Sequence, residues 1–204
     1  HRRKILREAQ AMARISHPNV VSVYEVGEVS DRIFIAMEFI DGQTLAQWQR
    51  QPGRTWQEVL AMYLQAGHGL AAAHASGLIH RDFKPDNVLV SRDGRARVLD
   101  FGLARRDERL LDSEDPAASA PSRSGAVDKL TQDGLISGTP GYMAPEQYDG
   151  QPVDARSDQF SFCAALFEAL FGTPPFAGRL AAEIASNTLA GHVQPRPKNS
   201  PVPE

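Results

Sequence analysis

The stretch that decides the fold is HRDFKPDN at residues 80–87, which is followed after a short interval by DFG at residues 100–102. Two short apolar runs lie in this region, residues 87–91 and 95–99, on either side of Asp93-Gly94. Asp-Gly is favoured in tight hairpin turns because both positions tolerate positive φ. The sequence therefore predicts a loop, a β-hairpin and a second loop over residues 80–100.

Upstream of this region, residues 55–75 predict a long buried helix. Thr55 and Glu58 have the spacing of a capping box, in which each residue satisfies a free backbone N–H of the first helical turn. Apolar residues then recur on one helical face, at Trp56, Val59 or Leu60, Tyr63, Ala66, Leu70 and Ala73.

The N-terminal part predicts one helix and two strands. Ile5, Ala9, Met12 and Ile15 recur at helical spacing, and no capping residue precedes them, so we expect further sequence upstream. Residues 20–26 and 32–39 are rich in β-forming residues and predict two strands.

Downstream, the sequence alternates between irregular and helical patterns. Residues 105–137 have no apolar period and predict a long loop. Helical patterns cover residues 154–171 and 179–190. Four prolines in residues 194–204 exclude a helix and predict extended chain.

Composition excludes several classes of protein. The 204 residues carry 22 Lys and Arg against 25 Asp and Glu, so the net charge of -3 does not indicate a nucleic-acid partner. No apolar run is long enough to span a bilayer. Cys163 is the single cysteine, which excludes an internal disulfide; its apolar surroundings favour a buried core residue over a reactive thiol. We expect a globular protein in a reducing, cytoplasmic compartment, although a membrane anchor could lie outside this chain.

Three motifs in this order resemble protein kinases. The run at 80–87 is similar to the kinase catalytic loop, DFG at 100–102 to the magnesium-binding triplet, and GTPGYMAPE at 138–146 to the substrate-docking segment. The chain is identified as similar to bacterial-type (eukaryotic-like) serine/threonine protein kinases over residues 1–192.

The resemblance implies an α+β, two-lobed protein-kinase fold that is incomplete at both ends. It assigns residues 1–39 to a truncated N-lobe, 40–42 to the hinge, 43–193 to a mainly helical C-lobe and 194–204 to the Pro-rich tail. No G-x-G-x-x-G loop occurs in the chain, so the family's phosphate-covering loop and strand lysine are expected upstream.

The resemblance also implies roles for the residues around the transferred phosphoryl group. Phosphoryl transfer asks the protein mainly to position groups and to neutralise charge. Asp82 matches the catalytic base, and Lys84 matches the lysine beside the phosphoryl oxygens, which favours Ser/Thr substrates. Asn87 and Asp100 match the ligands of the Mg²⁺, or Mn²⁺ in its place, that accompanies ATP.

For the rest of the nucleotide, the resemblance points to the hinge and the first helix. Met37 matches the residue that borders the adenine pocket, and main-chain groups of Glu38 and Ile40 would bind adenine. Leu89 would also contact ATP. Glu8 matches the helix glutamate that pairs with the upstream lysine. Without the resemblance, its position in the sequence would indicate only a solvent-exposed helix carboxylate.

Three residues match regulatory positions. Arg81 is typical of kinases whose activation segment is ordered by a phosphate, because a guanidinium offers a fork of donors. Thr131 resembles a phosphorylation site of bacterial kinases, and Thr139 matches a threonine whose hydroxyl binds the catalytic aspartate and lysine.

Four further residues match structural positions. His80 is expected in a hydrophobic column with Met12, Val23 and Phe101 rather than in acid–base chemistry. Glu146 would pair with an arginine of later helices, and Asp158 would hold the catalytic-loop backbone.

The sequence leaves three functions open. The first is an ATP- and magnesium-dependent Ser/Thr protein kinase that acts on proteins, with self-phosphorylation in trans as a further possibility. The second is a pseudokinase or scaffold, which has no chemical need for Asp82, Asn87 and Asp100 together. The third is a small-molecule kinase, against which the docking segment argues. We expect the 204 residues alone to be inactive and at best marginally stable.

Overall fold

The structure is a computed structural model and describes residues 10–30, 32–101 and 139–203. Two of the predicted site residues, Glu8 and Thr131, lie outside the described residues, as does the predicted loop at 105–137. The described part is α+β, with two small antiparallel sheets and several helices, which confirms the predicted fold class.

The first sheet is an antiparallel hairpin of β1 (Val23–Val29) and β2 (Arg32–Met37). The prediction of a strand at residues 20–26 is wrong at its start. Val20 instead forms a parallel bridge with Val98 of the second sheet, so the β-forming run is divided between the two sheets. An irregular register between Val23 and Glu25 follows this change of partner.

The second sheet has the strand order β3-β4-β5 and lies at the centre of the described fold. It consists of β3 (Gly42–Thr44), β4 (Val88–Ser91) and β5 (Ala96–Val98), each antiparallel to its neighbour. The predicted hairpin is confirmed, with Gly94 at φ +78° in the turn, a conformation that glycine adopts without strain.

The central helix α3 (Trp56–Ala75) also follows the prediction. Thr55 Oγ1 accepts from the N–H of Glu58 at 3.3 Å, and Glu58 Oε2 accepts from the N–H of Thr55 at 2.8 Å. Such a cap is worth about 1 kcal/mol. The buried face includes Val59, Tyr63, Ala66, Leu70 and Ala73. The short helix α2 (Leu45–Gln49) precedes α3 and is capped in the same way by Thr44.

The chain approaches α3 very closely at Gly69. A Cβ atom at this position would lie 2.3 Å from the carbonyl oxygen of Asn19. The Asn19 side chain in turn donates from Nδ2 to the carbonyl of Ala96, at the start of β5, at 2.8 Å. Glycine therefore allows the segment before β1, the helix and the second sheet to meet.

The helix α6 (Ala155–Phe171) packs against α3 and buries several polar side chains. The phenol of Tyr63 donates to the carbonyl of Ala165 at 3.1 Å, which joins the two helices. The prediction that Cys163 is buried is wrong, because at 100° per residue it points away from Ser161 and Ala165, which are both buried. Partial burial still raises the pKa of its thiol, which disfavours the reactive thiolate.

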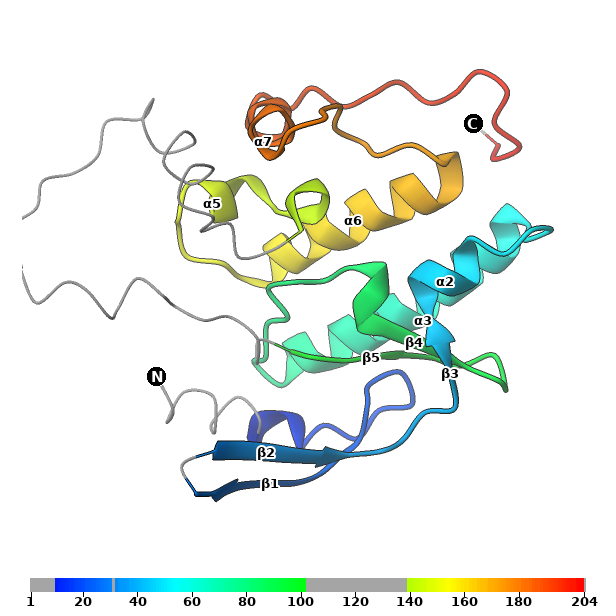
Figure 1. Ribbon diagram of the computed structural model, residues 1–204. Coiled ribbons are helices and arrows are strands. Elements are labelled where there is room, and N and C mark those ends of the chain that lie inside the picture. Colours follow the sequence, from blue (N-terminus) through cyan, green and yellow to red (C-terminus); the bar gives the residue numbers. More distant parts are fainter. Residues whose placement is uncertain (1–9, 31, 102–138, 204) are drawn as a thin grey trace, which may run out of the picture.

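Three further short elements pack around a small second core. The 3₁₀ turn η3 (Pro140–Tyr142), α5 (Pro145–Tyr148) and α7 (Ala181–Leu189) share a small core of Met143, Tyr148 and Ala185. In Figure 1 the β1–β2 hairpin lies at one end of the molecule, β3–β5 with α2 and α3 in the middle, and α6 and α7 at the other end.

The C-terminal residues contain no helix or strand over 194–203, as predicted, but they are not simply extended. Arg196 donates to the carbonyls of Val202 and, at 2.9 Å, Pro203, and its guanidinium lies 6.0 Å from the centre of the Phe171 ring. The tail therefore folds back on itself. Among the described residues, no helix combines the length and apolar character needed to cross a membrane.

Candidate active site

The loop at residues 80–87 connects α3 to β4 and is anchored in the core by aromatic side chains. His80 is fully buried, and its ring centre lies 4.8 Å from that of Phe101 and 5.8 Å from that of Phe83. Met12 and Val23, the other expected neighbours of His80, belong to the same buried core as Phe101. Burial lowers the pKa of His80, against the opposing fields of Asp158 and Asp82, so the ring is neutral at neutral pH.

Asp158, in the first turn of α6, holds the backbone of this loop. Its carboxylate is fully buried and accepts from the N–H groups of His80 and Arg81, both at 2.7 Å. His74, in the last turn of α3, lies 2.7 Å from the same carboxylate. These bonds support Arg81 at φ +69°, a left-handed conformation that is unfavourable for a residue other than glycine.

The side chains of Asp82, Lys84 and Thr139 meet at the open side of the loop. Lys84 Nζ lies 3.1 Å from Asp82 Oδ2 and donates to Thr139 Oγ1 at 3.2 Å. The Asp82 side chain keeps 33% of its surface exposed, enough for a reactant to reach it. Thr139 thus contacts the aspartate through the lysine, which joins the loop to the segment at 139–148.

Asn87 is the last residue before β4, and Asp100 is the second residue after β5, so the two lie on either side of the β4–β5 hairpin. Asn87 Nδ2 donates to the carbonyl of Asp82 at 2.8 Å, which leaves its side-chain oxygen able to accept. Asp100 is exposed and has φ +54°, and strained backbone of this kind is concentrated at functional sites. One amide and one carboxylate oxygen suit a hard cation that takes its other ligands from phosphate and water.

The segment at 139–148 packs against α6 through hydrogen bonds from its side chains. Tyr142 donates to Glu168 Oε2 at 2.7 Å, and burial together with this bond raises the pKa of its hydroxyl. Burial also raises the pKa of Tyr148 to about 12. Glu146 is half-buried and accepts from the hydroxyl of Ser157 on α6, while its pairing with an arginine of later helices stays a prediction.

Gln147, on α5 within this segment, is almost fully buried against the loop at residues 80–87. Its Nε2 donates to the carbonyl of Arg81 at 2.8 Å, and its Oε1 accepts from the N–H of Ala144 at 2.9 Å. A single side-chain amide therefore binds two backbone groups that lie far apart in the sequence.

A family model described as Protein kinase domain matches residues 1–201 of the chain. The chain belongs to the protein kinase family. It is 37% identical over 198 residues to Serine/threonine-protein kinase pkn2 of Myxococcus xanthus, which covers 94% of the chain. It is 35% identical over 201 residues to Serine/threonine-protein kinase PknD of Mycobacterium tuberculosis, which covers 98%.

A third relative is Probable serine/threonine-protein kinase PknB of Lactococcus lactis, which is 39% identical over 180 residues and covers 88% of the chain. The kinase chain spans only 21%, 27% and 26% of the lengths of these three relatives. The comparison therefore describes a catalytic domain rather than the whole of any relative.

At the expected hinge of the kinase, Glu38 has a structural contact that its sequence did not indicate. Its N–H donates to the carbonyl of Ser22 at 2.9 Å, and its carboxylate accepts from the N–H of Ser22 at 3.0 Å and lies 3.4 Å from Arg97 Nε. The side chain thus connects the end of β2 to β5. Because the N–H of Glu38 is bound to Ser22, the carbonyl is the main-chain group of Glu38 that remains able to accept a hydrogen bond.

The other expected adenine-contacting residues surround this position. Ile40 and Leu89 are half-buried, and Met37, the last residue of β2, is 37% exposed. The predicted strand at residues 32–39 is two residues too long, because β2 ends at Met37 and Phe39 lies beyond it with 92% of its surface exposed.

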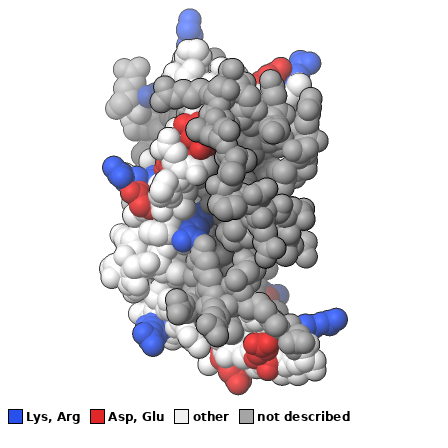
Figure 2. All heavy atoms as spheres, turned by 90° about the vertical axis from the view of Figure 1, so that its left-hand side faces the viewer, with Lys and Arg blue, Asp and Glu red and all other residues white. Residues whose placement is uncertain are grey.

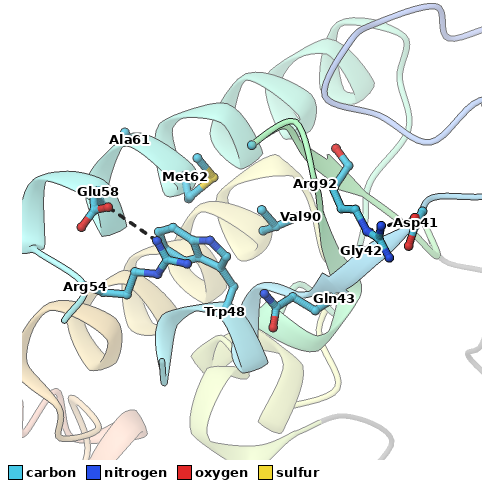
Figure 3. Close-up of a pocket in the computed structure, with 12 residues that line it drawn as sticks. Asp41, Gly42, Gln43, Trp48, Arg54, Glu58, Ala61, Met62, Val90 and Arg92 are labelled. Atoms are coloured by element: carbon cyan, nitrogen blue, oxygen red, sulfur yellow. Dashed lines mark ion pairs between the residues drawn. The ribbon is translucent and has the colours of Figure 1, made fainter. Parts of the chain in front are cut away.

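A cavity of about 620 Å³ lies elsewhere on the kinase domain, between α2, α3 and the β3–β4 strands (Figure 3). The Arg54 guanidinium lies 4.2 Å from the centre of the Trp48 ring and 3.5 Å from Glu58, and Arg92 lies 3.0 Å from Asp41. None of the lining residues belongs to the 80–87 loop. Because each arginine is paired with a carboxylate of the same cavity, the walls offer no excess charge for a triphosphate.

Figure 2 shows one face of the molecule with its charged side chains coloured. On the face shown in Figure 2, the described Lys, Arg, Asp and Glu side chains form small separate groups of both signs. No continuous basic stripe, the usual footprint of nucleic-acid binding, is visible among these described atoms.

Sequence reasoning missed His74, Gln147 and the hydrogen-bonding role of Ser157. Each is a polar residue at a position that faces the interior. A polar side chain on the otherwise apolar, inward-facing side of a helix is the signal that could have identified them. Their partners could not be read from the sequence, because the His74 and Gln147 contacts join residues 84 and 66 positions apart.

Proposed function

We propose that the protein containing this chain transfers the γ-phosphoryl group of ATP to Ser or Thr hydroxyls of protein substrates. The observation that carries the proposal is the contact of Asp82 with Lys84 at 3.1 Å, on a loop whose backbone is held by Asp158 and by Asn87. A carboxylate and an ammonium held side by side can orient a hydroxyl and stabilise the phosphoryl oxygens at the same time.

In the proposed reaction, the Asp82 carboxylate accepts a hydrogen bond from the substrate hydroxyl and takes its proton. The hydroxyl oxygen forms a bond to the γ-phosphorus while the bond from that phosphorus to the β,γ-bridging oxygen breaks, and ADP leaves. Lys84 Nζ, which the Thr139 hydroxyl helps to hold, lies beside the transferring oxygens as a point charge. The chemistry therefore needs no covalent intermediate with the protein.

The side-chain oxygens of Asn87 and Asp100 would hold the metal that accompanies ATP. A bound Mg²⁺, or Mn²⁺ in its place, supplies positive charge to the phosphates. Asn87 is suited to this role because its amide nitrogen is already bound to the carbonyl of Asp82, which directs the remaining oxygen away from that contact. The exposed Asp100 carboxylate provides the second ligand.

For adenine, we propose the carbonyl of Glu38 and a main-chain group of Ile40 as hydrogen-bonding partners. Met37 and Leu89 would supply apolar contacts, and both retain exposed surface to do so. The proposed pairing of Glu8 with an upstream lysine belongs to the same nucleotide site and concerns a residue outside the described part.

We also propose that Thr131 is phosphorylated in trans by a second copy of the kinase and that Arg81 binds the phosphate. The names of the relatives support Ser/Thr specificity. Phosphopeptide mapping of the active protein tests the proposal: the Thr131 phosphate should be present, and Thr131→Ala should reduce activity. An unmodified Thr131 in a fully active enzyme would contradict it.

The decisive experiment for the function uses the full-length protein, labelled ATP with magnesium, and a generic basic protein as phosphate acceptor. Phosphorylated Ser and Thr should appear with the wild type and far more slowly with Asp82→Asn, while Asp149→Asn, an exposed acid just beyond the docking segment, should behave as the wild type. Binding of ATP without transfer would instead support the pseudokinase interpretation.

A further inference from the structure

The peptide bond between Arg81 and Asp82 is held by side chains on both of its edges. Its carbonyl accepts from Gln147 Nε2 at 2.8 Å, and its N–H donates to His80 Nδ1 at 3.3 Å. One residue further, the carbonyl of Asp82 accepts from Asn87 Nδ2 at 2.8 Å. The two peptide planes that flank the Cα of Asp82 are therefore fixed, and with them the direction in which its carboxylate points.

The fixing of this peptide matters because Arg81 has a left-handed backbone, at φ +69°. A residue other than glycine leaves that region readily when its neighbours do not hold it. Rotation of the 81–82 peptide would turn the Asp82 side chain away from Lys84. Asp158 holds the N–H groups of His80 and Arg81, but the carbonyl of Arg81 is held by Gln147.

Gln147 is chemically suited to this position because a carboxamide both donates and accepts. Its Oε1 accepts from the N–H of Ala144 at 2.9 Å while its Nε2 donates to Arg81. The side chain is 8% exposed, so neither bond is easily replaced by water. A glutamate would keep the acceptor and lose the donor, and it would place a negative charge against the Arg81 carbonyl.

We infer that Gln147 is a positioning residue for the catalytic aspartate, and that it couples the docking segment to the catalytic loop. This inference rests on the proposed kinase function. The same amide binds Ala144, within the segment proposed to receive the protein substrate, and the peptide that orients Asp82. A displacement of the segment at 139–148 therefore moves the base, and a correctly seated segment holds it in place.

The test compares Gln147→Glu and Gln147→Met with the wild type in the full-length protein. Both variants should lower kcat by about tenfold or more, because small displacements of a reacting group are costly, with the KM for ATP changed by less than about twofold. Gln147→Met removes both hydrogen bonds without burying a charge. Gln151→Glu, at an exposed position beyond the 139–148 segment, introduces the same charge change and should leave kcat unaltered.

A double-mutant cycle separates positioning from general stability. If Gln147 acts through Asp82, Gln147→Met should cost little further turnover in an Asp82→Asn background. Equal losses in both backgrounds, or turnover of Gln147→Met within about twofold of wild type, would overturn the inference. Should Gln147→Glu fail to fold, Gln147→Met decides alone, with magnesium-dependent ATP binding as the measure of folding.

The two proposals fail in different ways. A wild-type protein that transfers no phosphate to protein refutes the proposed function. A wild-type kinase whose Gln147 variants are fully active refutes only the positioning role.

Discussion

His74 Nε2 lies 2.7 Å from Asp158 Oδ2, so the last turn of α3 is joined to the first turn of α6 at the carboxylate that also binds the backbone of the catalytic loop. Three donors therefore share one fully buried carboxylate. Buried charge of this kind is stable only when its hydrogen bonds are made. The contact thus ties the packing of two helices to the shape of the candidate active site.

We expect His74→Leu to lower the free energy of unfolding by about 1–3 kcal/mol, because it leaves the buried Asp158 with one donor fewer. Urea unfolding measures the change. His68→Leu is the matched control, since His68 lies exposed on the same helix and should change stability by about 0.5 kcal/mol or less. Equal stability of the two variants would show that the His74 contact contributes nothing.

Asp82→Asn should lower kcat by a factor of about a hundred or more while the KM for ATP stays nearly constant, because the carboxylate acts on the hydroxyl and not on adenine. Steady-state kinetics with a protein substrate provides the measurement. The exposed Asp149→Asn serves as control. Turnover of Asp82→Asn close to that of the wild type would remove Asp82 from the role of base.

Asp100→Ala should abolish the part of ATP affinity that depends on magnesium. Calorimetric titration with ATP, in the presence of Mg²⁺ and then with a chelator, isolates this part. Asn87→Ala should show the same loss and, in addition, should disturb the loop, because it also removes the bond to the carbonyl of Asp82. An unchanged effect of magnesium in Asp100→Ala would exclude this residue as a metal ligand.

The sequence predicted those parts of the site in which neighbours in the chain are neighbours in space. Asp82, Lys84 and Asn87 lie within six residues on one loop, and the Asp93-Gly94 turn returns the chain so that Asp100 follows β5. Turn chemistry was sufficient to predict the hairpin, whereas the roles of these residues rest on the resemblance and stay predictions. The capping box at Thr55 could be predicted for the same reason.

The remaining contacts depend on tertiary packing and could not be predicted. The bond of Gln147 to the Arg81 carbonyl spans 66 positions, and a lone polar residue does not reveal such a partner. Val20 was included in the strand predicted at residues 20–26, but it pairs with the second sheet, because a β-forming residue suits either sheet. Cys163 was misplaced because an apolar run indicates a helix but does not determine which of its sides is covered.

Two glycines of α3 should respond to substitution in opposite directions. At Gly69 a Cβ would lie 2.3 Å from the Asn19 carbonyl, a backbone atom that cannot easily move. At Gly67 the closest atoms are those of the Phe162 ring at 3.4 Å, which is ordinary contact. Gly69→Ala should therefore destabilise by about 1–3 kcal/mol, whereas Gly67→Ala should stabilise by up to about 1 kcal/mol through helix propensity.

Thermal or urea unfolding of the two glycine variants checks both signs in one experiment. Destabilisation of the same size in both would mean that residues 67 and 69 face similar surroundings. A stable Gly69→Ala would show that the segment around Asn19 does not lie against α3.

The buried His80 should make the stability of the kinase domain depend on pH below neutrality. Burial lowers its pKa in the folded protein, so as pH falls through the unfolded value near 6.5 the unfolded chain binds a proton that the folded chain does not. The stability that this group contributes is complete above that pH and declines below it, by at most about 1.4 kcal/mol per pH unit. Urea unfolding at pH 7.5 and 5.5 gives the difference.

His80→Phe keeps an aromatic ring against Phe101 and cannot bind a proton. It should lower stability at both pH values, because the N–H of Asp82 loses its acceptor, and it should flatten the pH dependence relative to wild type. An equal slope in wild type and variant would mean that His80 is not held neutral by its surroundings.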